Sequence, residues 1–255
     1  MIYREYRCIC CGACIQVCKN GAITWSGQGP IITDWQKCKG CRECISVCYA
    51  EAREEIGQEM TVAQVMIEIQ KDNAFYDESG GGVTFSGGEP LAQWEFLLAL
   101  LQACKQDHIH TAVDTSGYAE WYIIDRIRPY VDLFLYDLKV WDDAKHIQVA
   151  GVTNKSILHN LKMLSQLGHK ILIRVPIIQG INDINEDICR IGEFAASLPH
   201  ISGFELLSYH HMGISKYTRL NRAYDLSTTL PVPAEKMNKI VNTLRGFGLT
   251  VNLGG

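Results

Sequence analysis

Residues 8–18, CICCGACIQVC, and residues 38–48, CKGCRECISVC, carry the same arrangement of cysteines. Each run reads C-x2-C-x2-C-x3-C, and every cysteine of the second run follows its counterpart in the first by 30 residues. The chain has 11 cysteines, an odd number, and its first residues, MIYREYRC, lack the apolar core of a secretion signal. A disulfide framework is therefore disfavoured, and thiolates that bind metal are the better interpretation.

Both runs have the spacing of bacterial ferredoxins with two 4Fe–4S clusters. Three thiolates close in sequence hold one cluster, and the fourth cysteine of each run reaches the other cluster. The predicted ligand sets are Cys8, Cys11, Cys14 and Cys48 for one cluster, and Cys38, Cys41, Cys44 and Cys18 for the other. Structural zinc is the alternative, but zinc normally takes two separated C-x2-C pairs rather than two sets of four. Lys19 and Tyr49 replace the proline that usually follows the fourth cysteine, a residue that donates no ligand.

Three further cysteines lie outside this pattern. Cys10 falls between two predicted ligands and is interpreted as a spectator. Cys104 and Cys189 are isolated within helical sequence, where a buried, unreactive thiol is the expected state.

The character of the sequence changes after residue 55, so we predict a ferredoxin-like α+β module at residues 1–55 and a second domain at residues 56–255. Residues 61–64, TVAQ, form a capping box that begins a helix reaching about Lys71. The strands expected after it are Val83–Ser86, Thr111–Asp114, Val131–Asp137, Lys170–Ile177, Gly203–Tyr209 and Leu249–Leu253. The further helices expected are Trp94–Gln106, Trp121–Ile127, Asn154–Leu167, Glu186–Leu198 and Ala234–Phe247.

This alternation of strands and helices indicates the α/β class. Continuous apolar runs such as VDLFLYD and KILIRVPII favour a parallel sheet with both faces covered. Six strands are few for a closed eight-stranded barrel, so a partial (β/α) barrel is the preferred architecture. A doubly wound sheet is the alternative.

Polar residues gather at the carboxyl ends of five of these strands. In sequence order they are Gly87, Gly88, Glu89, Asp114, Asp137, Lys139, Arg174 and His210. Each has a purely structural explanation, such as a tight turn at the glycines, a loop-capping carboxylate or a solvated strand end. In a (β/α) barrel, however, the carboxyl strand ends share one mouth, and their joint placement there predicts a polar binding site.

These motifs together resemble a known family. The two cysteine runs, followed by SGGGVTFSGGEP, HTAVDTSGY, PYVDLFLYDLK, ILIRVPII and ELLSYHHMG, are similar to the glycyl-radical enzyme activating proteins of the radical SAM superfamily. The resemblance covers essentially the whole chain. It implies a partial (β/α) barrel that binds S-adenosylmethionine on a 4Fe–4S cluster, and two auxiliary 4Fe–4S clusters in a ferredoxin-like insertion. It also implies an anaerobic oxidoreductase that cleaves S-adenosylmethionine reductively and leaves a glycyl radical on a partner enzyme, with a flavodoxin or ferredoxin as reductant.

The resemblance also implies roles for individual residues. Gly87, Gly88 and Glu89 would contact the methionyl amino group of S-adenosylmethionine. Asp114, Asp137 and Lys139 would surround its carboxylate and sulfonium, and Asp114, Thr115 and Asp137 would hold a monovalent cation. Arg174 and His210 would contact the far side, with His210 near the adenosine. A zwitterionic methionyl group needs both an acid and a base, which agrees with this set.

One departure from the family concerns the catalytic cluster. The superfamily holds that cluster with C-x3-C-x2-C after the first barrel strand, and no cysteines here have this spacing. We therefore expect that the chain lacks the first strand and its cluster loop, that the third cluster belongs to a longer parent, and that the chain is inactive alone. The alternative is a two-cluster electron-transfer protein or a non-catalytic remnant. A radical SAM enzyme acting on a small molecule or peptide is a third possibility.

The overall composition disfavours some classes of binding partner. A net charge of −4 and a pI near 6.1 argue against broad binding to nucleic acid or anionic membranes. No apolar run approaches the roughly 20 residues that span a bilayer. We therefore expect a cytoplasmic protein whose particular glycyl-radical partner the motifs do not specify.

Overall fold

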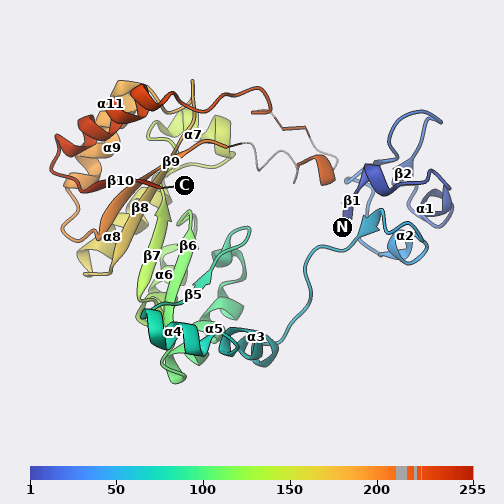
Figure 1. The fold of residues 1–255 in the computed structure, drawn as a ribbon, viewed down its shortest axis with the longest axis horizontal. Coiled ribbons are helices and arrows are strands. Elements are labelled where there is room, and N and C mark those ends of the chain that lie inside the picture. Colours follow the sequence, from blue (N-terminus) through green and yellow to red (C-terminus); the bar gives the residue numbers. More distant parts are fainter. Residues whose placement is uncertain (211–216, 221–222, 225, 255) are drawn as a thin grey trace. The chain divides into compact units, whose positions relative to one another are not determined.

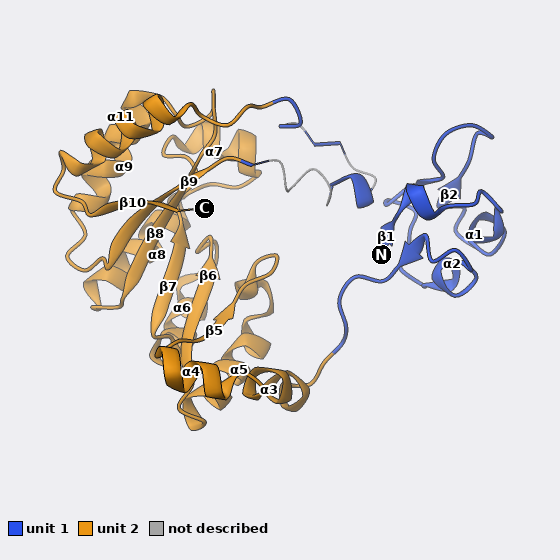
Figure 2. Ribbon diagram, viewed as in Figure 1, with its two compact units in different colours: residues 1–59, 210–228 blue, residues 60–209, 229–255 orange. Residues whose placement is uncertain are grey.

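The computed structural model describes residues 1–210, 217–220, 223–224 and 226–254. It divides the chain into two compact units, coloured separately in Figure 2. Unit 1 comprises residues 1–59 together with the described part of 210–228, and unit 2 comprises 60–209 together with the described part of 229–255. The predicted domain boundary at residue 55 stays a prediction, and each unit is described by itself.

Unit 1 repeats one pattern of short elements. Its elements are β1 (Ile2–Tyr3), η1 (Glu5–Arg7), α1 (Ala13–Gln16), β2 (Ile23–Thr24), β3 (Ile32–Thr33), α2 (Glu43–Ser46) and β4 (Arg53–Glu54). Strand β1 pairs antiparallel with β4, and β2 pairs antiparallel with β3. The two helices begin 30 residues apart, after Gly12 and Arg42, which both have left-handed backbone. The structure thus repeats with the same period as the cysteines.

Unit 2 is built on a parallel sheet of six strands. They are β5 (Gly82–Phe85), β6 (His110–Thr115), β7 (Leu133–Asp137), β8 (Ile171–Ile177), β9 (Gly203–Ser208) and β10 (Val251–Gly254). Their spatial order is the order of the sequence, from β5 at one edge to β10 at the other (Figure 1). A doubly wound sheet reverses its strand order at a switch point, so this sequential order is that of a partial (β/α) barrel. All six expected strands are confirmed, with small differences at their ends.

Two helices precede the first strand of unit 2, and the others connect consecutive strands. The helices are α3 (Val62–Gln70), α4 (Asn73–Ser79), α5 (Trp94–Gln106), α6 (Trp121–Ile127), α7 (Asp143–Ala150), α8 (Lys155–Gln166), α9 (Asn185–Ala196) and α11 (Ala234–Arg245), with short 3-10 turns η2 (Pro90–Gln93) and η3 (Arg128–Tyr130). The capping box at Thr61 is confirmed, because its side chain accepts from the Gln64 amide while Gln64 accepts from the Thr61 amide. Helices α4 and α7 are additions to the elements expected from the sequence. None of the helices in the described ranges is long and apolar enough to cross a membrane.

The two faces of the sheet differ in burial. Along β8 fully buried residues alternate with half-buried ones, beginning at Ile171. The buried face packs with residues of α5, α6, α8, α9 and α11 in one core. The other face, which includes Leu172 and Arg174, is only half-buried. The expectation that both faces would be covered is therefore corrected: in an open barrel the inner face keeps contact with solvent, and this leaves room for a site.

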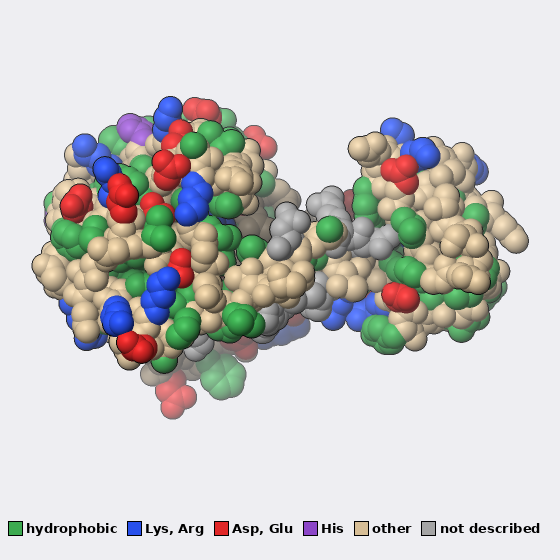
Figure 3. Space-filling model, turned by 90° about the horizontal axis from the view of Figure 1, so that it is seen from above, with side chains coloured by type: hydrophobic (Ala, Val, Ile, Leu, Met, Phe, Trp, Pro, Cys, Tyr) green, Lys and Arg blue, Asp and Glu red, His purple; other side chains and the backbone are tan. Residues whose placement is uncertain are grey.

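The surface of the protein mixes charges of both signs. On the face drawn in Figure 3, lysine and arginine side chains lie interspersed with aspartate and glutamate. This arrangement agrees with the small net charge of −4.

Candidate functional site

A polar cavity of about 290 Å³ lies at the carboxyl ends of strands β5 to β8. It is lined by Ser86, Gly87, Gly88, Glu89, Asp114, Thr115, Ser116, Asp137, Lys139 and Arg174. Seven of the eight predicted cofactor-binding residues thus come together, although they are spread from residue 87 to residue 174. The parallel sheet explains this, because it brings equivalent strand ends to one edge.

Strand register places the charged residues of this cavity beside one another. Asp137 is the direct neighbour of Arg174, and Asp114 lies on the same sheet face one strand further along. Arg174 Nη2 donates to Asp137 Oδ1 at 2.9 Å, and Arg174 Nε donates to the same oxygen at 3.2 Å. Arg174 Nη2 also donates to Asp114 Oδ1. One guanidinium therefore joins the two carboxylates, and the contact of Arg174 with the far side of the cofactor stays a prediction.

The charged side chains of the cavity differ in whether they have a partner of opposite charge. Burial raises the pKa of the Asp137 carboxyl, although Arg174 and Lys139 act in the opposite direction. Lys139 lines the cavity and makes no ion pair with any residue in the described ranges. Its ammonium group is thus free to bind a carboxylate from outside the protein.

Glu89 fastens the loop after β5 to the loop after β6. Its Oε1 accepts from Thr115 Oγ1 at 2.6 Å and from the Leu91 amide at 3.2 Å. Its Oε2 accepts from the amide and the hydroxyl of Ser116, at 2.9 and 2.6 Å. Four donors match the four lone-pair positions of a carboxylate, so this side chain is held in one place.

Two serines complete the lining and were missing from the sequence-based prediction. Ser116 holds Glu89, as described above, and Ser86 Oγ donates to Asp114 Oδ2 at 3.0 Å. Each serine is next to predicted site residues at the end of a strand. This position in the sequence could have identified them as lining residues.

Two buried asparagines, also absent from the prediction, fix the segment that carries Lys139. Asn182 Nδ2 donates to the Lys139 carbonyl at 2.6 Å. Asn154 Nδ2 donates to the carbonyls of Val140 and Trp141, at 3.2 and 2.6 Å. Asn154 and Asn182 are only 3% and 1% exposed, and three consecutive carbonyl groups are bound by them. Hydrogen bonds of this kind restrict where Lys139 can lie.

A third asparagine holds the loop after β6. Asn160 Nδ2 donates to the carbonyls of Gly117 and Ala119, at 2.9 and 2.8 Å. Gly117 has φ of +70°, and a Cβ there would come within 1.7 Å of Tyr136 Oη. Tyr136 Oη itself donates to the Ile157 carbonyl at 2.7 Å. Glycine is therefore required at position 117 both by its backbone angle and by the close tyrosine.

The eighth predicted residue, His210, does not line this cavity. It is exposed, lies two residues beyond β9, and begins the stretch that groups with unit 1. The rest of its motif, His211 to Gly213, falls outside the described residues. Contact between His210 and a cofactor stays a prediction.

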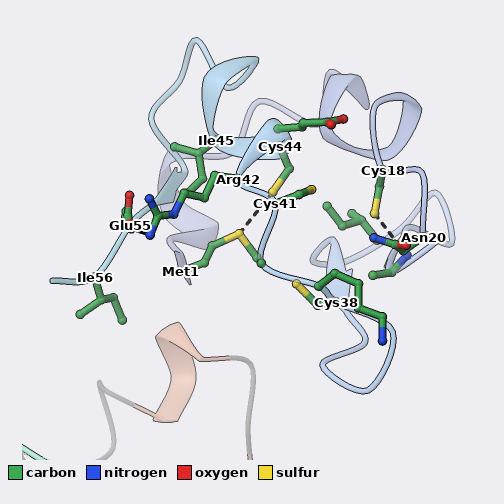
Figure 4. Close-up of a pocket in the computed structure, with 15 residues that line it drawn as sticks. Met1, Cys18, Asn20, Cys38, Cys41, Arg42, Cys44, Ile45, Glu55 and Ile56 are labelled. Atoms are coloured by element: carbon green, nitrogen blue, oxygen red, sulfur yellow. Dashed lines mark hydrogen bonds and ion pairs between the residues drawn. The ribbon is translucent and has the colours of Figure 1, made fainter. Parts of the chain in front are cut away.

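The eight motif cysteines of unit 1 surround two separate cavities. The larger, about 270 Å³, is lined by Cys18, Cys38, Cys41 and Cys44 among its residues (Figure 4). The smaller, about 20 Å³, is lined by Cys8, Cys11, Cys14 and Cys48. In both cases the fourth cysteine of one run joins the first three of the other. This is the grouping predicted from the ferredoxin spacing.

The donor set of these cavities fits iron–sulfur clusters. All eight cysteines are free thiols, and soft thiolates are the ligands of 4Fe–4S cubanes. Within the described part of the chain, no three His, Cys, Asp or Glu side chains converge closely enough to hold a single metal ion. A cubane spaces its four ligands more widely than a single zinc ion does, so four cysteines around a cavity suit the cluster better.

The three other cysteines differ in exposure: Cys104 is buried as expected, but Cys189 is only half-buried, which corrects the expectation of a buried thiol there. Cys10 is exposed and is not part of the lining of either cavity. Cys104 is fully buried, and burial raises the pKa of its thiol to about 11, so it is unreactive at neutral pH.

Comparisons with known proteins agree with this arrangement. Residues 37–194 match the family model of the radical SAM superfamily. The trans-4-hydroxy-L-proline dehydratase activating enzyme of Clostridioides difficile is 40% identical over 100% of this chain and 85% of its own length. The choline trimethylamine-lyase activating enzyme of Oleidesulfovibrio alaskensis is 36% identical over 99% of this chain and 83% of its own.

A solved structure is similar as well. The crystal structure of a domain of pyruvate-formate lyase-activating enzyme from Bacteroides vulgatus superposes with a TM-score of 0.59 and 34% sequence identity. The match covers 69% of this chain and 99% of that domain.

The catalytic cluster of the superfamily finds no matching ligands in this sequence. Its C-x3-C-x2-C spacing does not occur among the 11 cysteines. The residues present therefore do not fit that group.

Proposed function

This chain belongs to the radical SAM superfamily and, within it, to the glycyl-radical enzyme activating enzymes, and from this premise we propose how its cavities serve the reaction. The activity is the generation of a glycyl radical on a partner glycyl-radical enzyme by reductive cleavage of S-adenosylmethionine. The cleavage yields methionine and a 5′-deoxyadenosyl radical, which removes hydrogen from a backbone glycine of the partner. The observation that carries the proposal is the cavity in which Asp114, Arg174, Asp137 and Lys139 meet.

The strand-end cavity is proposed to bind the methionyl end of S-adenosylmethionine. That group carries an ammonium and a carboxylate, and the cavity offers both charges. Lys139, which has no ion pair among the described residues, would bind the carboxylate. Gly87 and Gly88 would contact the ammonium through their backbone carbonyls. Glu89 would add negative charge there, while its oxygens stay bonded to Thr115 and Ser116.

Asp114 and Asp137 are proposed to face the sulfonium and to hold a monovalent cation together with Thr115. Arg174 forms ion pairs with both carboxylates, so a bound cation would share them with the guanidinium. His210 is proposed to approach the adenosine.

The two cysteine cavities are proposed to hold two auxiliary 4Fe–4S clusters. These clusters supply one-electron transfer when bound, and a flavodoxin or ferredoxin is the proposed reductant. The role of this chain's residues is to hold the clusters through the two crossed sets of thiolates. A cytoplasmic location is proposed with them, since thiolate clusters persist in reducing compartments.

The test of function compares two proteins under anaerobic conditions. One is the 255-residue chain, and the other is the same chain preceded by a designed strand and a C-x3-C-x2-C loop of the superfamily spacing. Each is reconstituted with iron and sulfide and mixed with S-adenosylmethionine, reductant and a candidate glycyl-radical enzyme. We expect about eight irons in the first and about twelve in the second, from four per cubane. We expect a glycyl-radical EPR signal with the second protein.

Two outcomes would change the proposal. No radical and no 5′-deoxyadenosine from the extended protein, with any partner of the family, would overturn the activase function. The missing C-x3-C-x2-C favours a second candidate, a two-cluster electron-transfer protein. That candidate is defeated if the 255-residue chain itself forms 5′-deoxyadenosine.

A further inference from the structure

The two cysteine cavities are related by the 30-residue repeat, but one pair of counterpart residues differs in charge. Arg53 lines the cavity of Cys8, Cys11, Cys14 and Cys48. Its counterpart, Ile23, lines the cavity of Cys18, Cys38, Cys41 and Cys44. The strand pairing shows the same relation, because Arg53 pairs with Tyr3 and Ile23 pairs with Thr33. The repeat thus places a cation beside one set of thiolates and a hydrocarbon beside the other.

Arg53 is a buried cation that forms no ion pair with any residue the structure describes. It is 2% exposed, and its Nη1 donates to Thr33 Oγ1 at 2.9 Å. Its guanidinium carbon lies 5.1 Å from the centre of the Tyr3 ring. Nε and Nη2 are buried and have no hydrogen-bond partner in the described part of the chain. An unpaired buried charge is costly, so a negative group bound in the adjacent cavity would stabilise this guanidinium.

Among the described residues, no buried cation lines the other cavity, although the charge of Arg53 also acts on the Cys44 thiol there. Lys39 and Arg42 line it, but both are exposed. Arg42 is already paired with Glu55, and 57% of its side chain is open to solvent. Water screens such charges, so they act weakly on a group inside the cavity.

We propose that Arg53 donates through Nε and Nη2 to the sulfur atoms of the 4Fe–4S cluster held by Cys8, Cys11, Cys14 and Cys48, and raises its reduction potential above that of the other cluster. The inference rests on the two auxiliary clusters of the proposed function. Reduction adds one electron, supplied by the external reductant, to a cluster that is already negative. A buried cation and hydrogen bonds to sulfur stabilise that reduced state more than the oxidised one. An electron that enters unit 1 therefore settles on the Arg53-side cluster.

The test is an anaerobic redox titration of the reconstituted 255-residue chain, followed by EPR and reduced with dithionite. Iron is counted first, because about eight irons per chain, four per cubane, confirm the clusters on which the inference depends. Fewer irons in the wild type would contradict the proposed cofactor content rather than the role of Arg53. Arg53→Gln, Arg53→Lys and the control Arg42→Gln are then titrated beside the wild type.

We expect two separate midpoints in the wild type. Arg53→Gln should lower the higher midpoint, with about a tenfold loss in the ratio of reduced to oxidised cluster at fixed potential, which is about 59 mV for one electron. Arg53→Lys keeps the charge and should retain most of the wild-type midpoint. Arg42→Gln should change the ratio of reduced to oxidised cluster at fixed potential by no more than about threefold, for either cluster. Equal shifts in both clusters, or no shift in Arg53→Gln, would overturn the proposal. Loss of the Cys8 cluster in every Arg53 variant would also overturn it, because Arg53 would then be needed only to build the cavity.

Discussion

Arg174 and Asp137 are direct neighbours on the adjacent strands β8 and β7, and Arg174 Nη2 donates to Asp137 Oδ1 at 2.9 Å. The same guanidinium also bonds Asp114 on β6. Two carboxylates from different strands are therefore bridged by one cation, at the edge of the sheet where the proposed ligand binds. The arrangement both stabilises the barrel and determines the charge of the site.

Removing this guanidinium should weaken both the fold and the site. In Arg174→Gln, Asp114 and Asp137 lose their shared partner while their side chains are only 23% and 22% exposed. We expect unit 2 to lose about 2 kcal/mol, less than for a fully buried pair. Urea unfolding followed by tryptophan fluorescence measures this. Arg190→Gln, whose side chain is 56% exposed and pairs with Glu186 on the same helix, is the control and should change stability by under about 0.5 kcal/mol.

The raised pKa of Asp137 gives that variant a pH signature. A carboxyl whose folded pKa is raised binds its proton more tightly in the folded than in the unfolded state. Its contribution to stability is therefore full below the unfolded pKa, near 3.8, and is lost as pH rises through the raised folded value. In Arg174→Gln the guanidinium that counteracts burial is gone, so the loss should extend to higher pH. Unfolding free energies from acid to neutral pH that run parallel for wild type and variant would contradict this.

The asparagines that bind the segment after β7 should act on ligand affinity through Lys139. Asn182→Ala removes a 2.6 Å, partly buried hydrogen bond to the Lys139 carbonyl. We expect the free energy of unfolding to fall by about 2 kcal/mol. The dissociation constant for S-adenosylmethionine, measured by calorimetry, should be higher than in the wild type.

Two matched controls separate positioning from simple destabilisation. Asn185→Ala changes an exposed asparagine at the start of α9 and should alter neither quantity. Ser165→Ala removes a buried hydroxyl that bonds His200, away from the cavity. It should lower stability while leaving affinity unchanged. An Asn182 variant that loses stability but binds S-adenosylmethionine normally would show that the asparagine has only a structural role.

The crossed ligand sets can be tested with one cysteine. Cys48→Ala should damage the cluster held by Cys8, Cys11 and Cys14, because Cys48 lines their cavity. Alkylation of the reconstituted protein, mapped by mass spectrometry, should then modify those three cysteines and leave Cys38, Cys41 and Cys44 protected. The reverse pattern would mean that each run holds its own cluster.

The same alkylation map of the wild type should separate the remaining thiols. Cys10 is exposed and lies outside both cavities, so it should be modified at pH 8. Cys104 is fully buried with a pKa of about 11, so only about 0.1% is thiolate at that pH, and it should react only after unfolding. Rapid labelling of Cys104 in the folded protein at pH 8 would contradict its burial.

That the cysteine sets and the strand-end residues bind clusters and cofactor stays a prediction. Local patterns in the sequence were enough to predict the strands and to indicate residues that the structure brings together, namely each set of four cysteines and seven of the eight strand-end residues. This succeeded because each signal is periodic or lies at a strand end, and parallel strands bring their ends to one edge. Asn154, Asn160 and Asn182 carried no such signal. Their importance depends on burial, which follows from how the loops pack against the helices.

By itself the sequence determined the repeat of the cysteines and predicted which thiolates share a cluster, since a 30-residue repeat of C-x2-C-x2-C-x3-C admits few ways to surround two cubanes. Only the tertiary structure decided which of those two groups has a buried cation beside it. Residues 23 and 53 are equivalent in the repeat, and nothing local distinguishes an exposed arginine from a buried one. Folding brings Arg53 against Tyr3 and Thr33 and leaves two of its nitrogens without partners. The cost of leaving that charge unpaired makes the two similar cavities unequal.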